Sequence, residues 1–526
     1  MAFTRRRFLG SAAAASLLPL APAYARQHAG DLDVAIIGGG VSGVYAAWRL
    51  RQARPELHVR LFEMSDRIGG RLRSVAFPQA PQLVGEVGGM RFLDDQRHVA
   101  PLVRQLGLAR RFYPLFGKNN RLALRGKTFP YSEAGTPGHL YPYNIPDTEQ
   151  SQDSTAYMDG IARIVPDAKT MTPEKWRKIR ATLLYKGRPL KDWSAWTMLS
   201  EVFTHEELAF QQDSAGYDDV ALHESGLDQF DFVFTGIDFN KPFYTVVGGY
   251  QKLPTTLAEE AKRAGAGISM QTRLASVAIA PDGLFHLALV TADGRRAAIT
   301  ARQVVLALPR RSLELIDDFP ARREPHFADM ISSVDPIPAC KALLLYPKPW
   351  WRDLGITGGR SVTDMQARQF YPLGAETERT SAEPTNGHGV LMMYSDANTV
   401  EYWKEAAPPA QREAYGFQWL AGGSQLAQEV HREAKLVYGS DAPQPLAACF
   451  QDWTAEPYGG GWHFWRIGTD SAVMADRVQK PFADRDLYIC GEAYGVYEPG
   501  WVEGALERAE TMLQRHFGLP APKWLT

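Results

Sequence analysis

Three glycines near the beginning of the chain have the spacing of a phosphate-binding turn. Gly38, Gly40 and Gly43 form a G-x-G-x-x-G pattern, and Glu63 follows at the end of an apolar stretch. The first glycine of such a pattern permits a tight turn, the second lets the backbone approach a pyrophosphate, and the third lets a helix pack closely on a strand. A carboxylate roughly 20 residues further on can bind the hydroxyls of an adenosine ribose. The pattern therefore predicts a dinucleotide site. The other predicted contacts of this turn are Val41, Ser42 and Met64.

A second group of glycines and arginines indicates which dinucleotide is bound. The segment from Glu63 to Arg71 reads EMSDRIGGR and contains Gly70. It is similar to the E-x3-R-x-G-G-R signature of the flavin amine oxidase superfamily. Residues 302–312, 452–462 and 491–509 also resemble segments of that superfamily. The resemblance implies FAD, and we expect it to be bound non-covalently because no cysteine is placed as in a covalent attachment site.

The carboxyl-terminal segment resembles the flavin-binding motif at the end of these proteins. Glu492 follows a predicted strand, where it can accept hydrogen bonds from ribityl hydroxyls. The helix that opens at Trp501 and Val502 directs its N-terminus toward the pyrimidine edge of the flavin, where it would stabilise negative charge. The resemblance adds further expected FAD contacts, which are Gly88, Gly89, Met90, Arg91, Leu274 and Gly500.

Four residues indicate the substrate. The stretch GEVGGMRF over residues 85–92 looks like the G-x-M-R stretch of L-amino acid oxidases, and Arg91 matches the arginine that binds the substrate carboxylate. A planar guanidinium can bind a carboxylate through two parallel hydrogen bonds. Residues 360–372 resemble the segment in which a tyrosine, here Tyr371, donates to the same carboxylate. Gly500 and Trp501 match the pair that receives and flanks the substrate amine. The resemblance thus implies an L-amino acid.

One lysine and one missing histidine bear on the chemistry. Lys341 begins an apolar strand, where an unpaired lysine is costly. It resembles the lysine that holds a water near the flavin and is the predicted catalytic residue. The histidine that eukaryotic L-amino acid oxidases place ahead of a Gly-Gly pair has no match, because that distance reaches residues 232–234, and His205 and His223 do not align. A substrate that arrives as a neutral amine needs only positioning for hydride transfer.

The resemblance implies an FAD-dependent L-amino acid oxidase that yields a 2-oxo acid, ammonia and hydrogen peroxide. A monoamine or polyamine oxidase, an L-amino acid 2-monooxygenase and a flavin-bearing subunit without turnover stay open as alternatives. The side-chain preference is open as well. The aromatic stretch over residues 230–244 suits large apolar groups, Asp231 and Asp238 suit arginine or lysine, and packing under the helical region explains the stretch equally well.

The site requires elements that are far apart along the chain. Residues 32–37, 57–62, 304–308, 342–345 and 487–490 read as strands, and residues 42–53 and 501–517 as helices. We expect a mixed α/β fold with a discontinuous Rossmann-like FAD-binding domain (residues 32–75, 245–325 and 480–517). A mixed-sheet substrate domain (residues 76–130 and 326–479) and a mostly helical subdomain (residues 131–244) complete the prediction. The pattern over residues 104–228 indicates mainly helices.

Composition and the amino-terminal sequence predict the partners and the location of the protein. The chain of 526 residues has 58 basic and 59 acidic residues, so nothing suggests a nucleic acid partner. Its three cysteines have no metal-binding spacing and read as buried small side chains. Paired arginines, a short apolar run and Ala23-Tyr24-Ala25 predict a twin-arginine signal peptide over residues 1–25, its export machinery as a partner, and a periplasmic or secreted location without a permanent membrane span. A homodimer is a further expectation.

Overall fold

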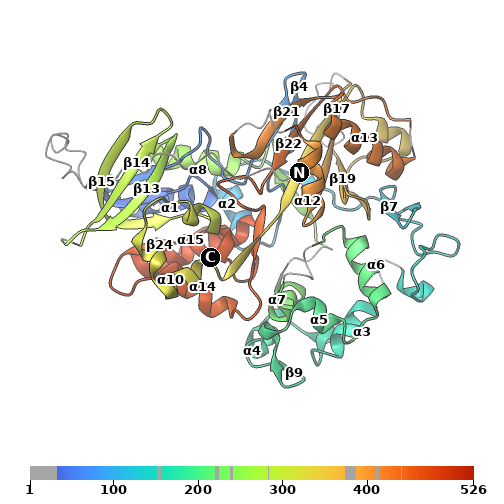
Figure 1. The fold of residues 1–526 in the computed structure, drawn as a ribbon, viewed down its shortest axis with the longest axis horizontal. Helices are drawn as coiled ribbons and strands as arrows, with labels where there is room; N and C mark the ends of the chain where they lie inside the picture. The colour runs from blue at the N-terminus through green and yellow to red at the C-terminus, as the bar shows by residue number, and fades with distance from the viewer. Residues whose placement is uncertain are drawn as a thin grey trace, which may run out of the picture.

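The computed structural model describes residues 32–150, 156–218, 224–236, 241–281, 283–373, 387–408, 414–439 and 441–525. The expected signal peptide, together with His223 and Asp238, lies outside the described residues. None of the helices in the described ranges is long and apolar enough to cross a membrane. The expected mixed α/β architecture is confirmed, with one sheet for the glycine turn, a second sheet beside it and a helical lobe at the lower right of Figure 1.

The first sheet collects strands from three distant stretches of sequence. β1 pairs in parallel with β2 on one side and with β15 on the other, and β24 joins β15 in parallel. β13 and β14 extend the sheet as an antiparallel hairpin. The strands are β12 (Gly267–Ser269), β2 (Val59–Phe62), β1 (Leu32–Ile37), β15 (Arg296–Leu306), β14 (Phe285–Thr291), β13 (Thr272–Ile279) and β24 (Leu487–Ile489).

Both faces of this sheet are covered, which explains the continuous apolar sequence of β1. Val34 and Ile36 belong to the core under three helices, whereas Ala35 and Ile37 belong to the core on the opposite face. Alternate strand residues point to opposite faces, so burial on both faces removes any polar alternation. The three helices are α1 (Val41–Ala53), α8 (Lys252–Arg263) and α15 (Val502–Phe517), and the opposite face is covered by α10 (Pro325–Ile331) and α14 (Ser471–Gln479).

The second sheet carries the predicted substrate residues. Strand β17 is buried throughout, with its odd-numbered positions facing Met90 and Tyr371 and its even-numbered positions facing α12 (Thr399–Ala406) and α13 (Gln425–Tyr438). Lys341 lies on the same face as Met90 because side chains alternate along a strand. The strand order is β21 (Phe417–Ala421), β22 (Ala447–Asp452), β17 (Ala339–Tyr346), β20 (Gly389–Asp396), β19 (Gln369–Pro372), β18 (Ser361–Thr363), β7 (Arg121–Leu124) and β8 (Lys127–Pro130).

The expectation of mainly helical structure from residue 104 onward was wrong for its first part. After α2 (Val99–Gln105) the chain forms β6 (Arg110–Tyr113) and then the β7–β8 hairpin, which extends the second sheet. The hairpin turns at Arg125 and Gly126, both with positive φ, and this Gly-containing turn after the apolar run of β7 was the available signal for strands. β6 pairs with β11 (Phe243–Val246), which in turn pairs with β5 (Phe92–Leu93). Ahead of β5, β3 (Ser74–Phe77) and β4 (Ala80–Glu86) form a separate hairpin.

The helical lobe contains short helices around one aromatic core. Trp176 is fully buried against Phe230 and Phe234, which accounts for much of the aromatic stretch as packing. Asp231 accepts hydrogen bonds from Trp176 and Arg180, so it is not available to a basic substrate. The helices are α3 (Ala156–Ala162), α4 (Pro173–Ile179), α5 (Ala195–Leu199), α6 (His205–Ala215) and α7 (Gly226–Thr235), with a small hairpin of β9 (Leu184–Tyr185) and β10 (Arg188–Pro189).

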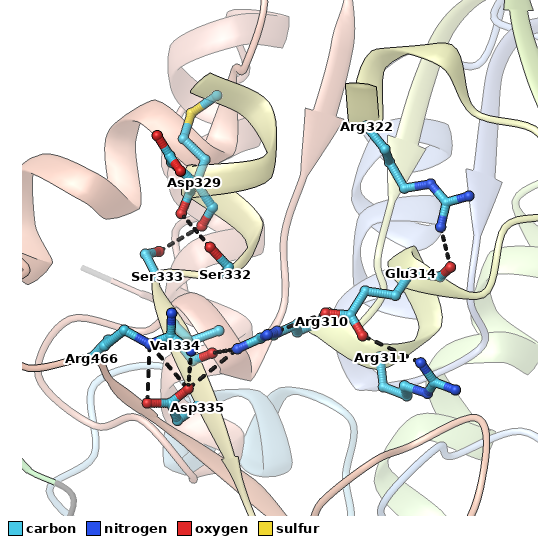
Figure 2. A network of polar contacts seen from close by, with 11 residues as sticks. Arg310, Arg311, Glu314, Arg322, Asp329, Ser332, Ser333, Val334, Asp335 and Arg466 are labelled. Carbon is cyan, nitrogen blue, oxygen red and sulfur yellow. Dashed lines mark hydrogen bonds and ion pairs between the residues drawn. The ribbon is translucent and has the colours of Figure 1, made fainter. Parts of the chain in front are cut away.

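An arginine-rich network ties the first sheet to the segment that leads into the second. Figure 2 shows Arg310, at the start of α9 (Arg310–Glu314), between Glu314 and residues Val334 and Asp335 of β16 (Val334–Ile337), which pairs in antiparallel fashion with β23 (Trp462–Trp465). Its guanidinium pairs with Glu314 at 2.8 Å and donates to the Val334 carbonyl at 2.7 Å. Asp335 accepts from Arg310 and, at 2.8 Å, from Arg466. Because α9 follows β15, these contacts fix the position of the turn after β15 relative to the pair of β16 and β23.

Candidate active site

A single large cavity of about 1240 Å³ runs from the glycine turn to the second sheet. It is lined by residues of both sheets, by the loop before α15 and by parts of α6 and α7. Many of the predicted site residues line it. These are Gly38, Gly40, Val41, Ser42, Glu63, Met64, Gly70, Arg71, Gly88, Gly89, Met90, Arg91, Leu274, Lys341, Glu492, Gly500, Trp501 and Val502. Gly43 and Tyr371 are the two predicted residues that do not line it.

The glycine turn has the geometry that its sequence predicts. Gly38 has φ +108°, and a Cβ there would lie 2.5 Å from the carbonyl oxygen of Ala307. A Cβ on Gly43 would lie 2.0 Å from the carbonyl oxygen of Gly38, which explains its place behind the cavity wall. By contrast, a Cβ on Gly40 would have no neighbouring atom within 4 Å and would enter the cavity. The first and third glycines therefore shape the turn, and the second leaves room for a ligand.

Glu63 joins the turn to the end of β2. Its Oε2 accepts from the backbone N–H of Gly39 at 2.6 Å, and its Oε1 accepts from the backbone N–H and the hydroxyl of Ser65 at 2.8 and 2.6 Å. The carboxylate is thus held at the cavity wall by three short hydrogen bonds. Such an oriented acceptor at the end of a parallel strand is suited to the hydroxyls of a ribose.

Glu492 also lines the cavity, where it forms an ion pair. It pairs with Arg71 at 2.6 Å and accepts from the backbone N–H groups of His463 and Gly500, each at 3.0 Å. Burial raises the pKa of this carboxyl, but Arg71 and His463 outweigh that effect and lower the pKa to about 2. Glu492 is therefore an anion that orients Arg71 and the loop of Gly500, in addition to the ribityl contact expected of it.

Arg91 is buried without an acidic partner. Its Nη1 donates to the Tyr371 hydroxyl at 3.1 Å, and its Nη2 donates to the Tyr217 hydroxyl at 3.3 Å. The guanidinium lies 5.0 Å from the centre of the Phe243 ring, and its Nε has no hydrogen-bond partner. No carboxylate in the described part of the chain forms an ion pair with it. A buried cation without an anion is unfavourable, so this site is arranged to receive a negative group.

Lys341 is the second cation on this wall. It is almost fully buried, and its Nζ donates to the Gly88 carbonyl at 2.5 Å. Burial is the main reason that its pKa falls from 10.5 to about 7, with Glu86 opposing and Arg91 adding to the shift. Glu86 itself has its pKa raised to about 7 by burial. Lys341 can thus hold or release a proton near neutral pH at an atom that faces the cavity.

Aromatic rings surround the space next to Arg91. Trp501 stacks on Phe243, with ring centres 6.3 Å apart, at the entrance to α15. Tyr394 and Trp462 stack at 6.3 Å beside Lys341. Gly500 has φ +80°, and a Cβ there would lie 3.2 Å from Trp462, so a larger residue would crowd this wall. These rings form a mostly apolar slot beside the Arg91 guanidinium.

Three wall residues escaped the sequence predictions. Tyr217 lies in a stretch without any motif, and only the fold brings it to Arg91. Arg360 begins the segment of residues 360–372, but its spacing gave no reason to single it out, and Tyr394 lies outside every segment with a resemblance. Of the three positions aligned with the missing histidine, Phe232 lines the cavity and Phe234 packs in the helical lobe. His205 is exposed at the start of α6, and no histidine of the described residues lines the cavity.

Comparison with known proteins identifies the family of the protein that contains this cavity. Residues 41–512 match the family of flavin containing amine oxidoreductases. The chain belongs to this family. It is similar to Achacin of Lissachatina fulica, at 25% identity over 93% of this chain and 94% of the relative. It is also similar to L-amino acid oxidase bordonein-L of Crotalus durissus terrificus, at 25% identity over 91% and 85%. Wild-type putrescine oxidase bound to putrescine shares the fold, with a TM-score of 0.68, 18% identity and coverage of 93% and 99%.

As a flavin amine oxidase, the protein is an FAD-dependent oxidoreductase, and its residues fit that cofactor. The space above Gly40, which a Cβ would enter, is suited to a pyrophosphate at the N-terminus of α1. Glu63 offers an oriented acceptor on the cavity wall, and Arg71, held by Glu492, offers a cation there. The cavity of about 1240 Å³ exceeds the usual volume of small-molecule pockets, as a cofactor plus a substrate requires.

Proposed function

We propose that the protein is an L-amino acid oxidase. The observation that carries this proposal is Arg91, a buried guanidinium at the cavity wall that contacts two tyrosine hydroxyls and forms no ion pair with any carboxylate of the described residues. An α-carboxylate supplies the missing anion and can bind the planar guanidinium through two hydrogen bonds. An oxidase of simple amines would leave the same cation buried and unpaired. Relatives that are named L-amino acid oxidases, such as bordonein-L, support the proposal.

The side chains around Arg91 would then hold the substrate. Arg91 binds the α-carboxylate, and Tyr371, which touches Arg91 from behind the wall, keeps the guanidinium in place. The carbonyl of Gly500 and the ring of Trp501 flank the amine. When bound, FAD supplies the acceptor for the hydride from the α-carbon, and oxygen then takes the electrons to give hydrogen peroxide. The main contribution of the chain is to hold the substrate in a reactive orientation.

Lys341 provides a proton site in this arrangement. Its Nζ is held at the Gly88 carbonyl, and its pKa of about 7 lets it exchange a proton at neutral pH. We assign to it the handling of a water molecule during hydrolysis of the imine or reaction with oxygen. The products would be a 2-oxo acid and ammonia.

Anaerobic mixing tests the proposed function. The FAD-loaded protein is mixed with L-leucine, L-glutamate and L-lysine, and separately with 3-methylbutylamine, which is L-leucine without its carboxylate. At least one L-amino acid should bleach the flavin absorbance, and the amine should not. Bleaching by amines alone would contradict the proposal. An amide product without hydrogen peroxide after admission of air would indicate a 2-monooxygenase instead.

We also propose export by the twin-arginine route to the periplasm or beyond, on the sequence of residues 1–25 alone. This route transports folded proteins, which suits a chain that binds a cofactor. Replacement of Arg5 and Arg6 by lysine should leave the FAD-loaded precursor in the cytoplasm of an expressing bacterium, as seen by fractionation. Unchanged export of this variant would contradict the proposal.

A further inference from the structure

A second buried guanidinium lines the cavity near Arg91. Arg360 lies just before β18, with only 5% of its surface exposed. Its Nη1 donates to the Gln369 side-chain oxygen at 3.1 Å, and its Nε is buried without a hydrogen-bond partner. No carboxylate in the described ranges pairs with it. Arg360, like Arg91, is therefore suited to bind an anionic group, because a buried cation is unfavourable without an anion.

Hydrogen bonds connect the two arginines. The Tyr371 hydroxyl accepts from Arg91 Nη1 at 3.1 Å and donates at 2.6 Å to the same Gln369 oxygen that accepts from Arg360. Three successive contacts of this length keep the two guanidiniums within about 9 Å of each other. Tyr217 also lies between them, since its hydroxyl accepts from Arg91 and its ring centre lies 5.6 Å from the Arg360 guanidinium. Both cations thus belong to one chamber.

The walls around Arg360 give this end of the cavity a polar character. The guanidinium lies 5.2 Å from the centre of the Phe116 ring, which in turn contacts Tyr131. The Tyr131 hydroxyl is buried and has no hydrogen-bond partner. Neither of these two atoms is exposed to the cavity, so a ligand would bind the part of the Arg360 guanidinium that lines the cavity, where a carboxylate supplies the anion that an apolar side chain lacks.

Two acidic residues of α7, Asp228 and Asp231, line the cavity, but they attract a basic substrate side chain less strongly than the two arginines attract an acidic one. Asp231 is held by Arg180 and Trp176, and Asp228 accepts from the Ser225 hydroxyl at the start of α7. One oxygen of Asp228 has no hydrogen-bond partner, but burial raises the pKa of this carboxyl to about 7 and so reduces its negative charge at neutral pH. Neither forms an ion pair with Arg91 or Arg360.

We propose that Arg360 binds the side-chain carboxylate of the substrate, so that the enzyme prefers acidic L-amino acids. The inference rests on the proposed function, because it assigns the α-carboxylate to Arg91 and the second carboxylate to Arg360. The two carboxylate carbons of an extended L-glutamate lie roughly 5 Å apart. The connecting hydrogen bonds set an upper limit of about 9 Å on the distance between the two Nη1 atoms, so a dicarboxylate of this length, with a hydrogen bond at each end, is long enough to reach both guanidiniums.

The test compares L-glutamate with L-glutamine, which has nearly the same shape but no side-chain charge. The ratio of kcat/KM for L-glutamate over L-glutamine should be at least about 10 in the wild-type enzyme and should fall toward 1 in Arg360→Met. The matched control is Arg295→Met, at an exposed position in the turn between β14 and β15, which should keep the wild-type ratio. A wild-type ratio near 1, or an unchanged ratio in Arg360→Met, would overturn the inference.

An inhibition experiment on the wild-type enzyme covers the case in which Arg360→Met does not fold. Glutarate has two carboxylates, whereas pentanoate is a monocarboxylate of equal length. Glutarate should inhibit at least about tenfold more strongly, since only it can engage both guanidiniums. Equal inhibition would overturn the inference. Flavin reduction by L-leucine or L-lysine but not by L-glutamate would do the same and leave the proposed function intact, whereas reduction by none of these amino acids would contradict both.

Discussion

At the scale of single residues, the chemistry depends on cations that burial makes unusual. Arg91 and Lys341 face one slot, and neither has an acidic partner within ion-pair distance in the described residues. The guanidinium cannot lose its charge, so it needs an anion from the substrate. The lysine can lose its proton, and burial lowers its pKa to about 7. Their positions on one wall thus separate substrate binding from proton handling.

Replacement of Arg91 by alanine should lower kcat/KM for L-amino acids by roughly 30-fold or more. This factor corresponds to about 2 kcal/mol, the usual cost of losing a hydrogen bond to a charged group. Steady-state oxygen consumption over a range of substrate concentrations measures it. The matched variant is Tyr217→Phe, which removes one hydroxyl beside the guanidinium and should have a smaller effect. If Arg91→Ala retains wild-type kcat/KM, the arginine has only a structural role.

Replacement of Lys341 by methionine should change the pH dependence of stability. Between its folded pKa of about 7 and its ordinary value of 10.5, the unfolded chain holds a proton that the folded chain lacks. The stability of the wild-type protein should therefore rise with pH across this window, by at most about 1.4 kcal/mol per pH unit relative to Lys341→Met. Melting temperatures of both proteins from pH 7 to pH 9.5 measure the difference. A difference that does not vary with pH would show that Lys341 keeps an ordinary pKa.

At the scale of elements, the glycine turn between β1 and α1 separates two functions of glycine. Gly43 allows α1 to approach the carbonyl of Gly38, whereas Gly40 leaves space on the cavity side. Gly40 has φ −70° and ψ 174°, which any residue can adopt. Its requirement for glycine therefore comes from the ligand and not from the backbone.

Alanine substitutions at these two glycines should have distinct effects. Gly40→Ala should fold with an unchanged far-ultraviolet circular dichroism spectrum but with less FAD per protein, because its methyl group enters the cofactor space. Gly43→Ala should lower both the melting temperature and the FAD content, because its methyl group would lie 2.0 Å from a backbone oxygen. Flavin absorbance per protein and thermal melting measure both. Full FAD content in Gly40→Ala would contradict the assigned place of the pyrophosphate.

At the scale of the whole molecule, the cavity exists because three parts of the chain remain docked. The arginine network of Figure 2 holds the turn after β15 against the antiparallel pair of β16 and β23. The helical lobe is held by Arg180, which pairs with Asp231 of α7 and donates at 3.1 Å to the Ser471 hydroxyl of α14. The expectation that the three cysteines are buried single side chains is confirmed, so docking does not rely on disulfides.

Arg180→Leu should weaken this docking. Loss of one partner leaves Asp231 buried without its main cation, which typically costs about 3–5 kcal/mol. The first thermal transition should move to lower temperature, and KM should rise because α7 lines the cavity. The control is Arg177→Leu on α4, whose side chain is exposed and 3.9 Å from Glu174, with an expected change within about 0.5 kcal/mol. Equal melting temperatures for both variants would contradict the role of Arg180.

The sequence by itself determined the local parts of this protein. The glycine turn, its flanking strand and helix, and Glu63 depend on backbone conformation and short-range spacing, which neighbouring residues set. The β1 bounds were predicted without error, and α1 begins one residue earlier than predicted. The β7–β8 hairpin was missed, because β8 begins with the exposed polar residues Lys127 and Thr128 and only its pairing with β7 makes it a strand.

Only the tertiary structure decided which charges remain unpaired. Arg91, Tyr217 and the pair Arg360 and Tyr371 come from three separate segments, and the register of β19 against its neighbours brings them together. Spacing along the chain suggested a role for Arg91 and Tyr371 by resemblance, but it gave none for Arg360 and Tyr217. The physical reason is that the need of a buried cation for an anion depends on every group packed around it, and these groups are selected by long-range packing.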